Sequence, residues 1–275
     1  MGNFFFFLFC QYKKDNSYID VFWSLTFVWP ALALLGLRLF NENDEDPDAR
    51  CYLTFGLVLI WALRLSIHIG VRHRGEDFRY QDMRKRWNEV GGYWGYLWRA
   101  FLYIFMGQGV FSVITNAAAL YVYIYSNSGT KLIWSDFVGA AVWLFGLVFE
   151  WVGDNQLKNH LADKTPGKKK FIQHGLWRYT RHPNYFGECV LWWGIWLIAC
   201  SVEWGFFTVF APLFISLLIR FVSGVPLLEE KYQGRPEWEQ YCRETNVFFP
   251  WFVNQEALKD GQNAVALQSQ PTENA

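Results

Sequence analysis

Several apolar runs, each close to the length that crosses a lipid bilayer, constrain this chain more than any other feature. Six of them are predicted to form membrane-spanning helices, at residues 18–40, 51–71, 97–125, 133–152, 184–200 and 205–227. A spanning helix needs about 20 apolar residues, and it satisfies its own backbone hydrogen bonds inside the bilayer. The composition agrees, because 52% of the 275 residues are hydrophobic and 20% are aromatic. We therefore predict an all-α membrane bundle of six transmembrane helices.

The charge of the loops predicts the orientation of this bundle. The loops at 72–99 and 153–183 each carry seven Lys or Arg residues, whereas the loop at 41–50 is acidic and the turn at 201–204 has no cation. Cytosolic loops are enriched in Lys and Arg, so both termini and the two basic loops are predicted to be cytosolic. The membrane would be the endoplasmic reticulum in a eukaryote. Because these cations serve orientation and the net charge is zero, nucleic-acid binding is not indicated.

The two ends of the chain lack the features of a spanning helix. The apolar stretch at 4–10 is too short to span and has no signal-peptide pattern, so it is a stub of a longer helix or an interfacial foot. If it does span, the helix count becomes seven. Residues 254–275 are polar and without periodicity, which predicts a disordered tail. Residues 1–253 are predicted to form one domain, and the five unpaired cysteines argue against a disulfide or zinc framework.

The densest set of polar side chains lies at 174–188, immediately before an apolar run. Charge at the mouth of a membrane segment is costly to keep. A cationic anchor beside lipid headgroups would explain arginines there, but it would not explain an asparagine, two tyrosines and a glutamate. We therefore predict a site for a phosphate-bearing ligand at the membrane surface, with Arg178, Arg181 and His182 as donors to phosphate oxygens.

Helical spacing places further polar residues on shared faces around this stretch. Asn184 and Glu188 are one turn apart after a proline, and together they can donate to the oxygen and accept from the NH2 group of a carboxamide, as a nicotinamide ring requires. A capping role is the simpler alternative for Asn184. Glu150, Asp154 and Lys158 are also spaced four apart. They form either a ladder of solvated ion pairs or a face directed at the same ligand.

Two other groups of residues are candidates for ligand contact. After the last apolar run, Tyr232, Arg235 and Tyr241 are suited to stack on or hydrogen-bond a nucleotide, although an amphipathic helix on the membrane surface would have the same pattern. Arg64 and His68 lie four apart within the second predicted span. Ionisable groups inside a membrane face the bundle interior or a cavity, so this pair is either structural or in contact with substrate.

Three motifs, read together, carry a resemblance to a known family. They are Gly153-Asp154-x-Gln156-Leu157, Gly175-Leu176-Trp177-Arg178-Tyr179-x-Arg181-His182-Pro183-Asn184-Tyr185-x-Gly187-Glu188 and Ser223-Gly224-Val225-Pro226-Leu227-Leu228-Glu229. They resemble the membrane-bound steroid 5-alpha-reductase-like family, and within it the DUF1295 branch, over about residues 20–251.

The resemblance implies a bundle of six or seven helices that holds NADPH in a pocket at its cytosolic face, within about residues 133–253. It also implies hydride transfer to an activated carbon–carbon double bond of a lipid, such as a 3-oxo-Δ4 steroid, while a donor stabilises the developing enolate oxygen. The cofactor-binding residues predicted from the motifs and their neighbours are Asp154, Lys158, Arg178, Tyr179, Arg181, His182, Asn184, Tyr185, Glu188, Tyr232 and Arg235.

The chain departs from the steroid reductases in its N-terminal half. Those enzymes use a Glu and a Tyr from N-terminal helices to polarise the substrate ketone, and neither aligns here. We take Tyr80 and Glu76 as the candidate catalytic donors, and Arg64 and His68 of the second span as candidate substrate contacts. The substrate is left open as a lipid or steroid-like enone.

Two alternatives belong to other functional classes. Integral-membrane methyltransferases of the isoprenylcysteine carboxyl methyltransferase type share the RHPxYxG stretch and a later Glu-Glu, and bind S-adenosylmethionine. The upstream Gly-Asp-x-Gln-Leu motif and the Asn-Tyr-Phe-Gly-Glu form favour the reductase. A lipid-binding or scaffold protein without catalysis is the third reading. No GxGxxG segment indicates a soluble dinucleotide-binding fold.

Overall fold

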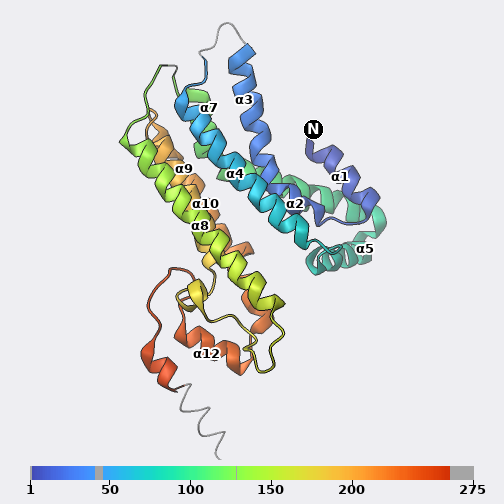
Figure 1. Ribbon diagram of the computed structural model, residues 1–275. Helices are drawn as coiled ribbons and strands as arrows, with labels where there is room; N and C mark the ends of the chain where they lie inside the picture. The colour runs from blue at the N-terminus through green and yellow to red at the C-terminus, as the bar shows by residue number, and fades with distance from the viewer. Residues whose placement is uncertain (1, 41–45, 128, 261–275) are drawn as a thin grey trace, which may run out of the picture. The chain divides into compact units, whose positions relative to one another are not determined.

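A computed structural model describes residues 2–40, 46–127 and 129–260, and within these ranges the chain forms helices and no strands (Figure 1). The predicted all-α fold is confirmed for this part of the chain. The elements, with η for 3-10 and π segments, are α1 (Gly2–Lys13), α2 (Tyr18–Trp23), η1 (Ser24–Phe27), α3 (Val28–Phe40), α4 (Ala49–Arg72), α5 (Phe78–Arg99), η2 (Ala100–Met106), α6 (Gly107–Thr115), α7 (Ala117–Tyr125), α8 (Trp134–Ala162), η3 (Gly175–Arg178), α9 (Pro183–Ala199), η4 (Gly205–Val209), α10 (Phe210–Leu217), η5 (Leu218–Ser223), α11 (Val225–Glu229), η6 (Glu230–Tyr232) and α12 (Pro236–Glu244).

Five of the described helical stretches are long and apolar enough to cross a membrane. They are Tyr18–Phe40, Ala49–Arg72, Phe78–Thr115, Trp134–Ala162 and Gly205–Tyr232. The chain is thus a multi-pass membrane protein. The remaining predicted span corresponds to α9, whose 17 residues would rise about 26 Å, near the lower limit for crossing a bilayer. The count of six and the orientation stay predictions.

The third predicted span, 97–125, differs from the structure at both ends. The helix begins at Phe78, because the Asp77 side chain caps it by accepting from the backbone NH of Arg79 at 2.9 Å. Its first half is polar and lies in the predicted basic loop. Gly92, at φ 62° and ψ −167°, then breaks the helical geometry in a conformation that glycine tolerates. The helix ends at Thr115, and Asn116 separates it from α7. Apolar content marks the membrane segment but not where a helix starts.

The chain divides into two compact units, each assembled from two segments. Unit 1 contains residues 1–141 and 194–214, and unit 2 contains residues 142–193 and 215–275. The predicted single domain over 1–253 stays a prediction. In unit 1 the N-terminal apolar stretch forms α1, which packs Phe7 and Cys10 against Tyr96 and Phe105. This stretch is therefore a helix, and one of its faces packs against other helices of unit 1.

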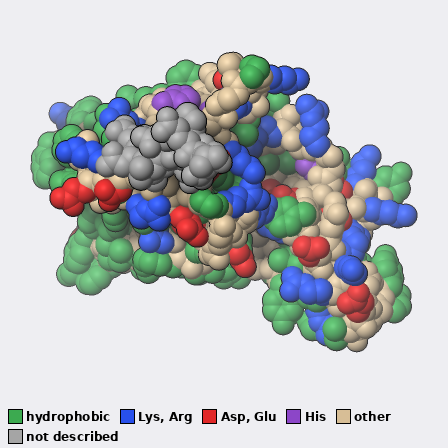
Figure 2. Space-filling view, turned by 90° about the horizontal axis from the view of Figure 1, so that it is seen from below, with side chains coloured by type: hydrophobic (Ala, Val, Ile, Leu, Met, Phe, Trp, Pro, Cys, Tyr) green, Lys and Arg blue, Asp and Glu red, His purple; other side chains and the backbone are tan. Residues whose placement is uncertain are grey.

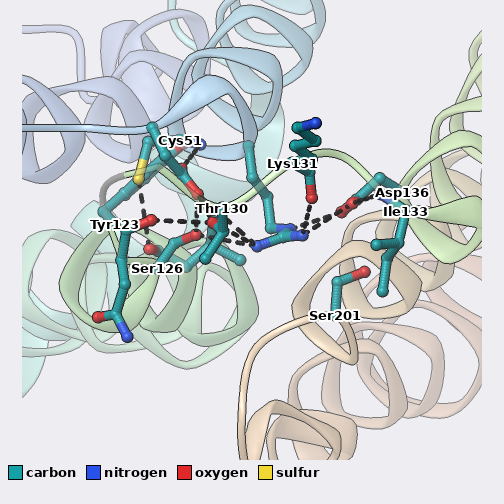
Figure 3. A network of polar contacts seen from close by, with 12 residues as sticks. Cys51, Tyr123, Ser126, Thr130, Lys131, Ile133, Asp136 and Ser201 are labelled. Atoms are coloured by element: carbon teal, nitrogen blue, oxygen red, sulfur yellow. Dashed lines mark hydrogen bonds and ion pairs between the residues drawn. The ribbon is translucent and has the colours of Figure 1, made fainter.

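A buried polar network connects the start of α4, the first turn of α8 and the loop between α7 and α8 (Figure 3). Arg50, at the start of α4, donates from Nε at 2.7 Å and from Nη2 at 2.9 Å to the two carboxylate oxygens of Asp136, in the first turn of α8. Ser126 and Thr130 donate to Oδ2 of Asp48. Burial opposes ionisation of Asp48, but these hydrogen bonds hold the pKa of its carboxyl below the ordinary value. The network secures the loop between α7 and α8 to the start of α4.

Glycines let α8 and α9 approach each other closely within unit 2. A Cβ atom placed on Gly146 would lie 2.5 Å from the backbone nitrogen of Leu191, and one on Gly187 would lie 2.5 Å from that of Glu150. Small residues at such contacts allow backbones to touch in membrane proteins. Further along, a Cβ atom placed on Gly153 would lie 3.1 Å from the backbone nitrogen of Asn184. We call these contacts the glycine seam; they bring the polar end of α8 against the start of α9.

The C-terminal part differs from the predicted disordered tail at its beginning. Residues 255–260 are helical, and Oδ1 of Asn254 accepts from the backbone NH groups of Glu256 and Ala257 in the first turn. Asparagine is a favoured capping residue, and this local signal outweighs the polar composition. Residues 261–275 of the predicted tail lie outside the described residues. All five cysteines are free.

Candidate functional site

Asn184 and Glu188, which were predicted to recognise a carboxamide, lie with Asp154 in unit 2. Pro183 is the first residue of α9, so Asn184 and Glu188 fall one turn apart on the same helix, as the spacing predicted. Asn184 donates from Nδ2 to Oδ1 of Asp154 on α8 at 3.1 Å. Asp154 and Glu188 are both buried. We call Asp154, Asn184 and Glu188 the amide–carboxylate cluster.

This cluster lies in an apolar environment. Oε1 of Glu188 accepts from Nε1 of Trp192, one turn further along α9, at 3.2 Å. Glu150, one turn before Asp154 on α8, is also buried. Ionisable side chains at membrane depth are costly and mark functional sites. Carboxylate oxygens accept from an NH2 group, and the Asn184 side chain has both a donor and an acceptor, so the cluster has the hydrogen-bonding groups that a carboxamide needs.

Arg181 and His182, predicted as phosphate donors, converge instead on Glu229 of α11. The Arg181 guanidinium donates from Nε at 2.9 Å and from Nη2 at 3.2 Å to the two oxygens of Glu229. Its Nη1 donates to the carbonyls of Cys242 and Thr245. Every nitrogen of this guanidinium therefore has a protein partner. Arg181 positions the turn before α9 against α11 and the end of α12, and its role in cofactor binding stays a prediction.

His182 also contacts Glu229 in this cluster. Its Nε2 lies 2.9 Å from Oε1 of Glu229, and its ring stacks on that of Tyr185 at 5.7 Å and 12°. Burial lowers the pKa of His182 below its ordinary value, against the hydrogen bond to Glu229, which raises it. The Tyr185 ring in turn approaches Gly224, where a Cβ atom would lie 3.1 Å from a ring carbon. Gly224 is therefore needed for this packing.

Tyr232 and Arg235 lie in a second packed group of unit 2. The Tyr232 ring contacts Phe171 at 4.9 Å and Trp238 at 5.2 Å, and the Arg235 guanidinium lies 5.4 Å from the Tyr232 ring centroid. Tyr241, on the same helix as Trp238, is buried and donates to a backbone carbonyl. Tyr232 and Tyr241, whose rings were predicted to stack on a nucleotide, both contact the Trp238 ring, at 5.2 and 5.6 Å, and their role in nucleotide binding stays a prediction.

The last three predicted cofactor residues lie at the surface. Lys158, Arg178 and Tyr179 are exposed. The backbone carbonyl of Arg178 accepts from the Thr245 hydroxyl, and that of Tyr179 accepts from the backbone NH of Trp251. Figure 2 shows Lys and Arg side chains at several places on one face, next to exposed hydrophobic side chains. The shared role of the eleven predicted residues in cofactor binding stays a prediction.

The predicted catalytic Tyr80 belongs to a polar group in unit 1. Its buried hydroxyl donates to Oδ1 of Asp20 at 2.5 Å. Gln108 donates from Nε2 to the Tyr80 hydroxyl oxygen at 3.2 Å, and Arg79 donates to Oδ2 of Asp20 at 3.0 Å. Asp20 opens the first span, so the group holds a phenol and a carboxylate at the entry of the helices. We call Asp20, Tyr80 and Gln108 the phenol cluster.

The other predicted donor, Glu76, belongs to a separate network of unit 1. It accepts from Nη2 of Arg84 at 2.6 Å and from the backbone NH of Asn16 at 2.9 Å. Asn16 also donates to the hydroxyl of Tyr96. A carboxylate engaged by a guanidinium and an amide serves the packing of the loop before α2 against α5. The roles of Tyr80 and Glu76 as donors to substrate stay predictions.

Arg64 and His68, the predicted substrate contacts, are partly buried on α4. His68 Nε2 lies 3.0 Å from Nη1 of Arg72, one turn further along. The role of Arg64 and His68 in substrate contact stays a prediction. Sequence reasoning did not predict that Glu229 contacts Arg181 and His182, or that Gln108 contacts Tyr80. The Leu-Leu-Glu-Glu stretch was the signal for Glu229, whereas a single glutamine in an apolar run gave none.

A known protein family matches most of this chain. The family described as "Protein of unknown function (DUF1295)" matches residues 6–245. An uncharacterized protein of Schizosaccharomyces pombe is 24% identical over 266 residues, covering 87% of this chain and 74% of the relative. The 3-oxo-5-alpha-steroid 4-dehydrogenase 1 of Bos taurus is 32% identical over 104 residues, 37% of this chain. The Rattus norvegicus protein of that name is 33% identical over 101 residues, 36% of this chain. These matches span 38% and 37% of the two mammalian enzymes. No solved structure matches.

Proposed function

Because this chain belongs to the DUF1295 family of steroid 5-alpha-reductase-like membrane proteins, we propose that it is a membrane-bound reductase. In this proposal it uses NADPH to reduce a carbon–carbon double bond conjugated to the carbonyl of a lipid, such as a steroid-like enone. The partial similarity to two 3-oxo-5-alpha-steroid 4-dehydrogenases supports the reaction class. The basic loops support a cytosolic position for both termini, in the endoplasmic reticulum of a eukaryote.

The observation that carries the proposal is the amide–carboxylate cluster. Asp154, Asn184 and Glu188 are buried or partly buried polar groups on two apolar helices, joined by the 3.1 Å hydrogen bond between Asn184 and Asp154. Buried amides and carboxylates at membrane depth are retained where a polar ligand is bound. The carboxamide of a nicotinamide fits these donors and acceptors, and the cofactor supplies the hydride when it is bound. The exposed Lys158 and Arg178 are suited to the phosphates.

The phenol cluster supplies a candidate donor for the substrate carbonyl. Reduction of an enone develops negative charge on the carbonyl oxygen, and a positioned hydroxyl stabilises that charge. The Tyr80 hydroxyl is directed at Asp20. If Asp20 takes up a proton, its carboxyl donates to the Tyr80 oxygen and leaves the phenolic hydrogen for the substrate. Gln108 donates to the same oxygen and keeps the ring in place.

Ligand binding by the detergent-purified protein tests the cofactor. We expect NADPH to raise the thermal midpoint and to titrate calorimetrically, and S-adenosylmethionine to do neither. Glu188→Ala should weaken NADPH binding at least about tenfold, since it removes a charged hydrogen-bonding group worth about 1.5–3 kcal/mol. Glu239→Gln, on the exposed face of α12, is the matched control and should bind normally.

The outcomes separate three classes of protein. Binding of S-adenosylmethionine alone would replace the reductase by a methyltransferase. Binding of neither ligand by a folded protein would favour a scaffold without catalysis. Normal NADPH binding by a folded Glu188→Ala protein would keep NADPH as the cofactor but would show that the amide–carboxylate cluster does not bind it. If NADPH binds, enone lipids are then screened by loss of NADPH absorbance.

A further inference from the structure

Three large aromatic side chains near the end of the described chain are exposed. The exposed fractions are 72% for Phe249, 67% for Trp251 and 78% for Phe252. They lie in the irregular segment that follows α12, at residues 246–253, which we call the hook. The hook begins just after the family match ends at residue 245. A contiguous exposed apolar patch of this kind marks an interaction surface.

Hydrogen bonds fix the backbone of the hook beside the start of α9. The backbone NH of Arg181 donates to the carbonyl of Asn246 at 2.9 Å, and the backbone NH of Trp251 donates to the carbonyl of Tyr179 at 3.0 Å. Between them, the Thr180 hydroxyl donates to the carbonyl of Phe248 at 2.7 Å. Residues 179–181 end two positions before Pro183, where the apolar helix begins. The hook is therefore held at the depth where α9 starts.

A row of rings continues from the hook along the apolar helices of unit 2. Phe249 contacts Phe186, in the first turn of α9, at a centroid distance of 6.0 Å. Phe186 contacts Phe149 of α8 at 5.3 Å, and Phe149 contacts Phe145, one turn away, at 5.5 Å. Phe145 is exposed and lies within a candidate membrane span. The apolar surface of the hook is thus continuous with the surface that the span presents to lipid.

We propose that the hook is a membrane-interface anchor, with the rings of Phe249, Trp251 and Phe252 inserted between the lipid headgroups and the first carbons of the acyl chains. Trp is enriched at this depth because it combines an apolar body with one N–H donor. Tyr179, also exposed, and the Arg178 side chain border the hook and suit the same zone. The described ring pairs of the hook meet edge to face, at 87° for Phe248–Phe249 and 70° for Trp251–Phe252. They leave no parallel slot for a nucleotide base, which favours lipid as the occupant.

The anchor would act on the turn before α9 as well as on the membrane. The hook contributes a carbonyl to the backbone of Arg181 and another to Thr180, so its position determines where this turn lies. The Arg181 side chain holds Glu229, which also contacts His182. Lipid contact at the hook therefore stabilises the turn that carries this ion-pair cluster. The proposal depends on membrane insertion and not on the reductase activity.

Depth-dependent fluorescence quenching of the full chain tests the anchor. The partly exposed Cys200 and Cys242 are replaced by Ser, leaving three buried cysteines. One new cysteine, Phe252→Cys, is labelled with the environment-sensitive NBD fluorophore in nanodiscs of phosphatidylcholine and phosphatidylserine. Glu239→Cys, on the exposed face of α12, is the matched control. A nitroxide lipid with the spin label near the headgroup and aqueous iodide are the two quenchers.

We expect the nitroxide lipid to quench the Phe252→Cys probe several-fold more than the Glu239→Cys probe, and iodide to do the reverse. Equal iodide quenching at both positions, without quenching by the nitroxide lipid, would overturn the proposal. So would a change of the Phe252→Cys emission on addition of NADPH without nitroxide quenching, because the hook would then face a nucleotide. Phe249→Cys repeats the measurement at a second ring and replaces Phe252→Cys if that variant does not fold.

Discussion

Filling the glycine seam tests whether the close contact of α8 and α9 builds the candidate cofactor site. In Gly146→Ala the new methyl group would lie 2.5 Å from the backbone nitrogen of Leu191 and 2.7 Å from the carbonyl oxygen of Gly187, whereas ordinary contacts are 3.4–4 Å. Because the opposing atoms belong to the backbone of α9, no side chain can rotate away. The two helices must separate by about 1 Å, and a gap of that size loses a quarter to a half of each contact's dispersion energy.

The size of the effect follows from two opposing terms. Overpacking costs about 1–3 kcal/mol, and a contact with backbone belongs at the upper end of that range. Replacing glycine by alanine within a helix returns up to about 1 kcal/mol. We therefore expect Gly146→Ala to lower the free energy of unfolding by about 1–2 kcal/mol. Gly56→Ala on α4, where nothing lies within 4 Å of the added methyl group, should be neutral or more stable.

The assay is unfolding in mixed detergent micelles with increasing sodium dodecyl sulfate, followed by circular dichroism on both variants. NADPH binding is measured beside it, because separating α8 from α9 lengthens the hydrogen bond between Asn184 and Asp154. We expect Gly146→Ala to unfold at a lower detergent fraction than Gly56→Ala and to bind NADPH less tightly. If the two variants unfold at the same detergent fraction, α8 and α9 are not tightly packed at Gly146, and the reasoning from the 2.5 Å contact is refuted.

Three further predictions concern separate parts of the molecule. Tyr80→Phe should lower kcat of enone reduction with an unchanged Kd for NADPH; a parallel loss of NADPH binding would contradict its role as donor. Burial lowers the pKa of His182 in the folded protein. The stability that the neutral His182 contributes is therefore complete above about pH 6.5 and falls as the pH drops toward the folded pKa. The thermal midpoint should decline over that pH window, and it should decline less in His182→Gln. Arg50→Met leaves the buried Asp136 carboxylate without its partner and should cost about 3–5 kcal/mol, while Arg50→Met/Asp136→Leu should recover much of that loss in the detergent titration.

Local features of the fold were predictable because their causes are local. Proline at 183 and the spacing of Asn184 and Glu188 place both side chains on one turn of α9. Apolar runs located the membrane segments, but the start of α5 depended on the capping side chain of Asp77 and its break on Gly92. These signals lie outside the apolar run, so hydrophobicity could not place the ends of that helix.

The partners of the charged residues were not predictable, because they come from distant parts of the sequence. Arg181 has the chemistry of a phosphate donor, yet it binds Glu229, 48 positions away. Tyr80 finds Asp20 at a separation of 60. A sequence identifies a residue's hydrogen-bonding capacity but not which group will use it. The roles predicted for these residues in binding and catalysis stay predictions that the ligand titrations test.

The network around Arg50 also has a consequence for the order of biosynthesis. Its partner Asp136 is synthesised 86 residues later, an interval of roughly 4–17 s at about 5–20 residues per second. During that time α4 enters the membrane, and the guanidinium of Arg50 is still in the aqueous interface. The carboxylate arrives only with the first turn of α8. The network can therefore form only after residue 136 has been synthesised, when the helices that precede the α7–α8 loop are already made.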